Sequence, residues 1–210
     1  MSTTYSNAIL DYIEAQASTI KAVSNLIGVR PEAVAGAIAE EYEKFKDEYV
    51  YEGLFNALGL LQNDSDLHAI LWAEFHSGDM GIWDLPLGKG SVRVSTAICL
   101  LLEYLNSARE KGDDIQNDAI YQMLLHFENN FGALCYAMMD ENNPTAIIMT
   151  ALMLKKADQF YSGTLPENTN LDMPSYYRSM FASNNGQTKL AWSLFDQDRM
   201  TGPQKWCQVK

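Results

Sequence analysis

The chain has little positive charge and little cysteine, and both shortages limit what it can do. Its 210 residues include 15 lysines and arginines against 27 aspartates and glutamates, which gives a formal net charge of −12. A surface that binds nucleic acid must be positive to displace the counterions of the phosphates, so we expect no nucleic-acid partner. Three cysteines cannot all pair within one chain, and Cys99 and Cys135 fall in apolar helical contexts, which indicates buried, reduced thiols.

Long hydrophobic runs are also missing. No apolar run approaches the roughly 20 residues that a helix needs to span a bilayer, so we expect no integral membrane segment. The N-terminal sequence MSTTYSNAILDY has neither the basic start nor the apolar core of a secretory signal peptide. These two absences predict a chain that is synthesised in the cytoplasm without a signal peptide.

Strand-like patterns are the third shortage. Alternating stretches rich in valine, isoleucine and threonine are nearly absent, whereas apolar residues at helical spacing are frequent. The sequence therefore predicts a mainly α fold. It contains no internal repeat, low-complexity tract or convincing domain boundary, so we expect residues 1–210 to form a single domain.

Caps and apolar spacing predict where the helices lie. Gly28 marks the end of a first helix and Pro31 the beginning of a second, because glycine is common just after a helix and proline in its first turn. The helix after Pro144 is apolar on nearly every face for three turns, which is typical of a buried central helix. The predicted helices cover about residues 4–26, 31–49, 66–75, 94–109, 115–127 and 145–161, with two shorter ones near 180 and 192–195.

The segment from Ser77 to Gly90 differs from the rest of the chain. Its sequence, SGDMGIWDLPLGKG, contains four glycines and a proline around Ile82 and Trp83. Glycine and proline at this density disfavour a helix, so we expect a loop or a small hairpin here.

The second predicted helix places a carboxylate, Glu41, beside its own apolar face. At about 100° per residue, Val34, Ile38 and Tyr42 form one apolar stripe, and Glu41 lies only about 20° from Val34. Its neighbour Glu40 projects much further round, toward the face that we expect to be solvated. Glu41, unlike Glu40, is therefore predicted to face the interior.

Two interpretations of Glu41 are open at this point. In the structural one, Glu41 is an edge residue whose carboxylate reaches water or pairs with Lys44 or Arg30. In the functional one, the apolar setting penalises the ionised carboxylate and raises its pKa. A carboxylic acid that is still protonated near neutral pH can donate a proton to a leaving group, which is the general acid's role in glycoside hydrolysis.

The sequence GVRPEAVAGAIAEEYEKF resembles the helix that carries the catalytic glutamate in the lysozyme and lytic-transglycosylase superfamily. In goose-type lysozymes and soluble transglycosylases, a small and aliphatic run ends in the pattern A-I-x-x-E, and Glu41 stands at that glutamate here. Downstream, GDMGIWDLPLGKGSVRVSTAICLLL resembles the glycine-rich loop and core helix of the family, including the G-x-G-N-I-x-x-x-T-A arrangement of some muramidases. The resemblance covers about residues 28–105, and Tyr42 stands where many members have serine.

This resemblance implies a lysozyme-like helical domain that cuts the glycan strands of peptidoglycan, with Glu41 as the general acid. Asp79 and Asp84 in the glycine-rich loop are the candidates for a base or nucleophile, although aspartates in loops also commonly form turns. Some members of the superfamily use the acetamido group of the sugar instead of a second acid. The same loop supplies the expected substrate-binding residues, which are Trp83, Gly81 and Ile82.

Two aromatic residues outside this loop, Trp72 and Tyr104, are further candidates for sugar stacking. Both lie on apolar helical stripes, so we expect them to be core residues instead. His68, His76 and His126 share neither a metal-binding motif nor a helical face, so no metal site is predicted. No glycine motif that cradles a phosphate is present either, and we predict no cofactor.

Two functions are compatible with this sequence. A peptidoglycan-cutting enzyme without a signal peptide would act in the periplasm or cell wall of a target bacterium, as a phage endolysin or a toxin exported by a type VI secretion system. A toxin of this kind implies a cognate immunity protein as its partner. The alternative is a non-catalytic, acidic, helical interaction module or adaptor that binds a basic partner, which the net charge of −12 also suits.

Overall fold

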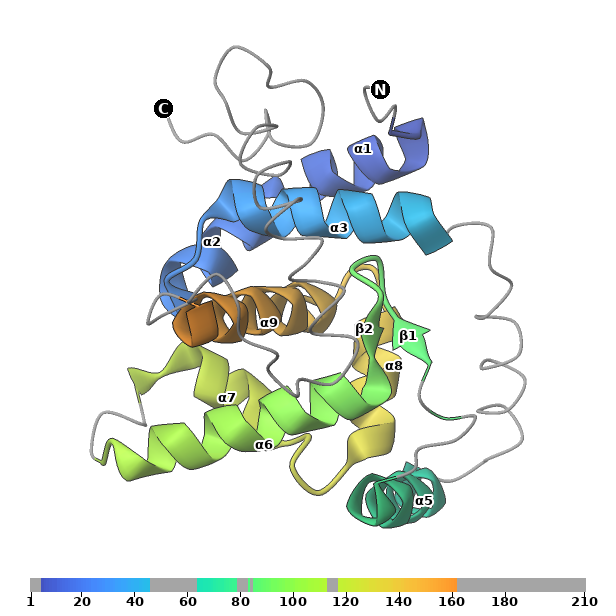
Figure 1. Ribbon diagram of the computed structural model, residues 1–210, viewed down its shortest axis with the longest axis vertical. Helices are drawn as coiled ribbons and strands as arrows, with labels where there is room; N and C mark the ends of the chain where they lie inside the picture. The colour runs from blue at the N-terminus through green and yellow to red at the C-terminus, as the bar shows by residue number, and fades with distance from the viewer. Residues whose placement is uncertain (1–4, 46–63, 79–82, 84, 113–116, 162–210) are drawn as a thin grey trace, which may run out of the picture. The chain divides into compact units, whose positions relative to one another are not determined.

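The computed structural model describes residues 5–45, 64–78, 83, 85–112 and 117–161, and that part of the chain is mainly helical (Figure 1). This confirms the predicted mainly α class. The helices are α1 (Asn7–Ala15), α2 (Ala17–Ile27), α3 (Pro31–Phe45), α5 (Asp64–Ser77), α6 (Val94–Glu110), α7 (Ala119–Leu125), α8 (Phe131–Met139) and α9 (Thr145–Tyr161). Two short strands, β1 (Pro86–Leu87) and β2 (Val92–Arg93), form an antiparallel pair. The two short helices expected near residues 180 and 192–195 lie outside the described residues.

The chain divides into two compact units. One comprises residues 1–40 and 151–210, and the other comprises residues 41–150. The boundary falls within α3, after Glu40, and within α9, after Thr150. The single domain expected for residues 1–210 stays a prediction.

The first unit contains α1, α2 and most of α3. The sequence pattern predicts one continuous helix over residues 4–26, but the structure breaks it at Gln16, whose backbone leaves the helical conformation at φ −94° and ψ 5°. Gly28 ends α2 with φ 78° and donates its N–H to the carbonyl of Ser24, as expected of a glycine cap. Pro31 is the first residue of α3, which confirms the predicted start.

The second unit contains α5, the β1–β2 hairpin, α6, α7, α8 and the first turns of α9 (Figure 1). Every residue from Thr145 to Thr150 is at least 95% buried, which confirms the predicted central helix. At its start, the Asn143 side chain accepts hydrogen bonds from the backbone N–H and the hydroxyl of Thr145, at 3.0 and 2.6 Å. Asn143 therefore acts as a cap, as its position before Pro144 predicts.

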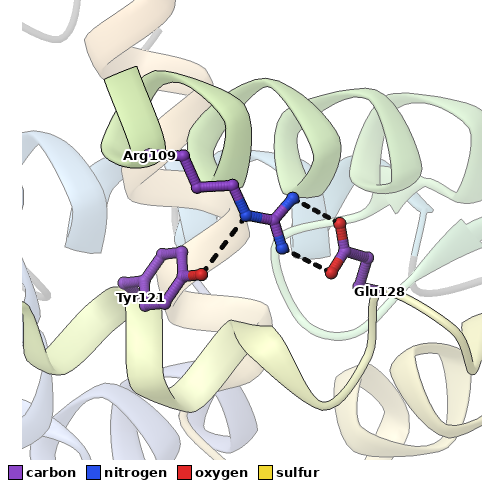
Figure 2. A network of polar contacts seen from close by, with 3 residues as sticks. All are labelled: Arg109, Tyr121 and Glu128. Atoms are coloured by element: carbon purple, nitrogen blue, oxygen red, sulfur yellow. Dashed lines mark hydrogen bonds and ion pairs between the residues drawn. The ribbon is translucent and has the colours of Figure 1, made fainter. Parts of the chain in front are cut away.

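A polar network joins α6 to α7 and the turn that follows it (Figure 2). Arg109 donates two hydrogen bonds to the carboxylate of Glu128, both at 2.6 Å, and a third from Nε to the Tyr121 hydroxyl at 3.3 Å. A bidentate pair of this kind fixes orientation as well as distance. These hydrogen bonds raise the pKa of Arg109 and lower the pKa of Glu128. The network fixes the C-terminal end of α6, whose N-terminal end follows directly from the hairpin.

Two helices differ from the predicted ones. α7 is shorter than expected because it begins only after Asp118, whose side chain accepts the backbone N–H of Tyr121 at 2.9 Å. α8 is absent from the predicted helix ranges, although Cys135 within it was placed in an apolar helical context. Its sequence, FGALCYAMM, is apolar nearly all round and therefore has no helical period to detect. Asn130 caps it by accepting the N–H of Ala133, and that asparagine is the signal that could have located the helix.

Candidate functional site

Glu41 lies in α3, where it is half-buried. Val34 and Ile38, which define the predicted apolar stripe of this helix, are at most 1% exposed, so the stripe is confirmed for these two residues. Tyr42, the next member of the stripe, is half-buried. The carboxylate of Glu41 therefore comes from the part of α3 where a fully buried face gives way to a partly exposed one.

Glu40 is not on a solvated face, contrary to the sequence-based expectation. It is half-buried, and its Oε1 accepts a hydrogen bond from the Tyr5 hydroxyl at 2.5 Å. Tyr5 precedes α1 and is 35 positions away in the sequence, so no local pattern could reveal the contact. Glu40 therefore has a long-range structural role.

A small hairpin begins at the end of the glycine-rich segment, at Pro86, and runs beyond it to Arg93, while residues 79–82 and 84 lie outside the described residues. Leu87 pairs with Val92, both fully buried, and residues 88–91 form the loop between them. The loop closes with a hydrogen bond from the Ser91 N–H to the Gly88 carbonyl at 3.1 Å. Gly88 and Ser91 both have positive φ, at 67° and 48°, a conformation that suits glycine and is uncommon for serine. The hairpin ends at Arg93, and α6 begins with the next residue.

The loop packs its backbone directly against other elements of the same unit. A Cβ atom on Gly88 would lie 2.6 Å from the carbonyl oxygen of Met138 and 2.7 Å from the Cβ of Ala146. A Cβ on Gly90 would collide with the side chain of Thr150, which is fully buried. These two glycines therefore allow the loop to lie against α9 and the C-terminal end of α8.

Lys89, between the two glycines, connects the hairpin to α3. Its Nζ lies 4.8 Å from the centroid of the Tyr42 ring, within the range of a cation–π interaction. The same Nζ lies 2.7 Å from Oε1 of Glu141, in the connection between α8 and α9. The tip of the glycine-rich hairpin thus contacts the residue that follows Glu41 in α3.

Most of the other predicted site residues lie outside the described residues. These are Asp79, Gly81, Ile82 and Asp84. Trp83 is described and is half-buried, and its carbonyl accepts the N–H of Leu85 at 2.9 Å. The roles that the sequence suggests for these loop residues stay predictions.

Trp72 is 43% exposed, so the expectation of a core residue is wrong. α5 packs on α8, and the rings of Trp72 and Phe131 stack with their centroids 5.6 Å apart. In this pair Phe131 is fully buried, and Trp72 lies on its more exposed side. Tyr104 is half-buried, and its hydroxyl donates to both carboxylate oxygens of Asp118, at 2.8 and 3.1 Å. Burial and this hydrogen bond raise the pKa of Tyr104. The hydrogen bond links α6 to Asp118, the residue that caps α7.

Histidine and cysteine have structural surroundings. Nδ1 of His68 accepts the backbone N–H of Phe131 at 3.0 Å, and burial lowers the pKa of His68. Cys135 is buried, which raises its pKa to about 12 and leaves an unreactive thiol at neutral pH. Cys99 is half-buried, and its thiol donates to Oε1 of Glu103 at 3.4 Å.

No group of three or more histidine, cysteine, aspartate or glutamate side chains in the described part of the chain is arranged to hold a metal ion. No helix among the same residues has both the length and the apolar character to cross a membrane.

Comparison with known proteins assigns no family to this chain. No protein-family model, no curated protein and no solved structure matches it. The geometry of the site is therefore the basis for any functional assignment.

Proposed function

We propose that the chain is a lysozyme-like glycosidase that cuts the glycan strands of peptidoglycan, with Glu41 as its general acid. The observation that supports this proposal best is the contact of Lys89, at the hairpin tip, with the ring of Tyr42. It brings a glycine-rich hairpin to the end of the helix that carries the candidate acid, within one compact unit. Glycoside hydrolysis needs a general acid and a neighbouring loop that can bind the sugar beside it.

In the proposed reaction, the carboxyl group of Glu41 gives its proton to the glycosidic oxygen as the bond from that oxygen to the anomeric carbon breaks. The positive charge that develops on the sugar is stabilised by Asp79 or Asp84, or by the sugar's own acetamido group. Water or a hydroxyl of the same sugar then adds to the anomeric carbon, and its proton returns to Glu41. The first nucleophile gives a hydrolase and the second a transglycosylase.

The hydrogen bond of the adjacent Glu40 provides a control for testing Glu41. Glu40 accepts a hydrogen bond from Tyr5, and a glutamine at position 40 can still accept it through its amide oxygen. Glu40→Gln should therefore fold normally and keep its activity. The same chemical change one residue later, in Glu41→Gln, removes the proposed acid.

The decisive experiment is clearing of a suspension of purified cell wall by the wild type, Glu40→Gln and Glu41→Gln at matched concentrations. We expect the wild type and Glu40→Gln to clear the suspension at rates within about 2-fold, and Glu41→Gln to be slower by at least about 100-fold, the usual contribution of a general acid. An inactive wild type, or a Glu41→Gln variant as active as the wild type, would refute the proposal.

The proposal includes the place of action and the partner. The substrate would be met in the periplasm or cell wall of a target bacterium after export, for example by type VI secretion, and a cognate immunity protein would block the site in the producing cell. If the wild type clears no cell wall, the competing function is the non-catalytic interaction module, which the net charge of −12 favours for a basic partner.

A further inference from the structure

We propose that Lys89 is a positioning residue for Glu41, which it holds in place by fixing the ring of Tyr42 against the hairpin. This inference rests on the proposed function only in taking Glu41 as the acid. The link itself depends on contacts among described residues of one compact unit.

The ammonium of Lys89 has anchors on two different segments. On one side it lies 4.8 Å from the ring centroid of Tyr42, in α3. On the other it lies 2.7 Å from Oε1 of Glu141, in the connection that leads from α8 into α9. The Lys89 side chain is 24% exposed and the Glu141 side chain 60% exposed, so the cation is largely sheltered while its carboxylate partner is not. A partly desolvated cation interacts more strongly with a ring than a fully hydrated one.

The backbone of the hairpin loop that carries Lys89 is closely packed. Gly88 and Gly90, on either side of Lys89, leave no room for a Cβ atom against Met138, Ala146 and Thr150. The loop closes on itself through the Ser91 N–H and the Gly88 carbonyl, 3.1 Å apart. Because the backbone on both sides of Lys89 is packed in this way, the position of its side chain is set by the loop and not by the lysine itself.

The other end of the link needs such support. Glu41 and Tyr42 lie in the last two turns of α3 as the structure describes it, and both are half-buried. A partly exposed part of a helix opens more easily than a fully buried one. A general acid works only when its oxygen lies within hydrogen-bonding reach of the leaving group, and a misplacement of about 1 Å can cost about 100-fold in rate. Fixing Tyr42 therefore fixes the backbone that carries Glu41.

This geometry makes the ring of Tyr42 essential and its hydroxyl dispensable. Tyr42→Phe keeps the ring face and should keep full activity, whereas Tyr42→Leu removes it. Lys89→Arg keeps a cation that can lie over the ring and pair with Glu141, so it should rescue what Lys89→Met loses. Since Lys89 and Tyr42 act through one contact, the Lys89→Met, Tyr42→Leu double variant should be no worse than either single variant.

The test measures kcat and KM for these variants on soluble peptidoglycan fragments, with Lys155→Met as the matched control. Like Lys89, Lys155 uses its ammonium in a long-range contact, a hydrogen bond to the Gly28 carbonyl at 3.4 Å. Lys155 and Gly28 belong to the other compact unit. We expect Lys89→Met and Tyr42→Leu to lower kcat by about 10- to 100-fold with KM within about 3-fold, and Lys155→Met to change neither. The positioning role would be overturned if KM in Lys89→Met or Tyr42→Leu rises by the same factor by which kcat falls. It would also be overturned if the two losses of kcat multiply in the double variant.

Hydrogen exchange at backbone amides tests the link without using activity. If Lys89 holds the end of α3, Lys89→Met should speed exchange in residues 41–45 by about 5-fold or more and leave the centre of α6 unchanged. Unchanged exchange in residues 41–45 would overturn the inference whether or not the protein is an enzyme. If Lys89→Met speeds exchange in these residues but the wild type cleaves no cell wall, only the proposed function is overturned.

Discussion

An alanine at position 88 would need space that the hairpin loop does not have. Gly88 has φ +67°, and a Cβ built on its backbone lies 2.6 Å from the Met138 carbonyl oxygen and 2.7 Å from the Cβ of Ala146. Carbon atoms in contact normally stay about 3.5 Å or more apart, so one side must move by most of an ångström. The obstacle on the Met138 side is backbone at the end of α8, which cannot turn away as a flexible side chain can.

Two costs add up in Gly88→Ala. The left-handed backbone conformation costs an L-residue about 1–2 kcal/mol, and forcing an extra methyl into a packed site costs about 1–3 kcal/mol. We therefore expect the free energy of unfolding to fall by about 2–5 kcal/mol. For a chain of this length, such a loss lowers Tm by about 4–20 °C.

Gly112→Ala separates the two costs. Gly112 also has a positive φ, at +80°, but a Cβ there would meet no atom of the described residues within 4 Å. It should lose only the conformational term, about 1–2 kcal/mol. Thermal and urea unfolding of both variants by circular dichroism gives the comparison. If Gly88→Ala is no less stable than Gly112→Ala, the close packing of the loop against α8 and α9 is wrong.

The remaining predictions concern the half-buried His68 and the fully buried Ser24. Burial lowers the pKa of His68 in the folded state, and its Nδ1 accepts the Phe131 N–H only while unprotonated. The neutral form is therefore favoured by folding, and its contribution to stability is complete above the unfolded pKa of about 6.5 and lost as the pH falls below it. Urea unfolding between pH 7.5 and 5 should thus show a steeper loss of stability for the wild type than for His68→Asn, and parallel curves would contradict this. The hydroxyl of Ser24 is fully buried and has no hydrogen-bond partner among the described residues, so Ser24→Ala should raise the free energy of unfolding by about 1–3 kcal/mol. Ser18→Ala, at an exposed position of α2, is the control and should gain only a few tenths of a kcal/mol from helix propensity, so an equal gain in both variants would refute the argument.

The helix boundaries that the sequence predicted correctly depend on contacts between residues close together in the chain. Gly28, Pro31 and Asn143 lie where a helix ends or begins, and each acts through contacts within a few residues. The small hairpin followed from the same kind of signal, because glycines at close spacing disfavour a helix whatever lies around them.

The sequence could not predict what depends on distant partners. Trp72 lies on an apolar stripe, but only the packing of α5 on α8 decides that Phe131 is buried and Trp72 is not. Glu40 was expected to be solvated because the local pattern could not reveal its partner, Tyr5, which lies near the beginning of the chain. The Lys89 contact with Tyr42 is of the same kind, since nothing in either local sequence indicates the other. The candidate acid could thus be chosen from helical geometry, but the residue that supports it could not.

Gly88 and Lys89 are adjacent, yet substitutions at the two positions should have different effects. Gly88 contacts the ends of α8 and α9 through its backbone, so an added methyl group strains the packing of the unit itself. Lys89 contributes a largely sheltered side chain whose partners include a half-buried ring and an exposed carboxylate. Losing the ion pair with the exposed carboxylate costs a folded protein about 1 kcal/mol at most, and losing the more sheltered cation–π contact costs about 1–2 kcal/mol. A loss of kcat in Lys89→Met at nearly unchanged Tm would therefore reflect the position of Glu41, whereas the same loss in Gly88→Ala could arise from the strained loop alone.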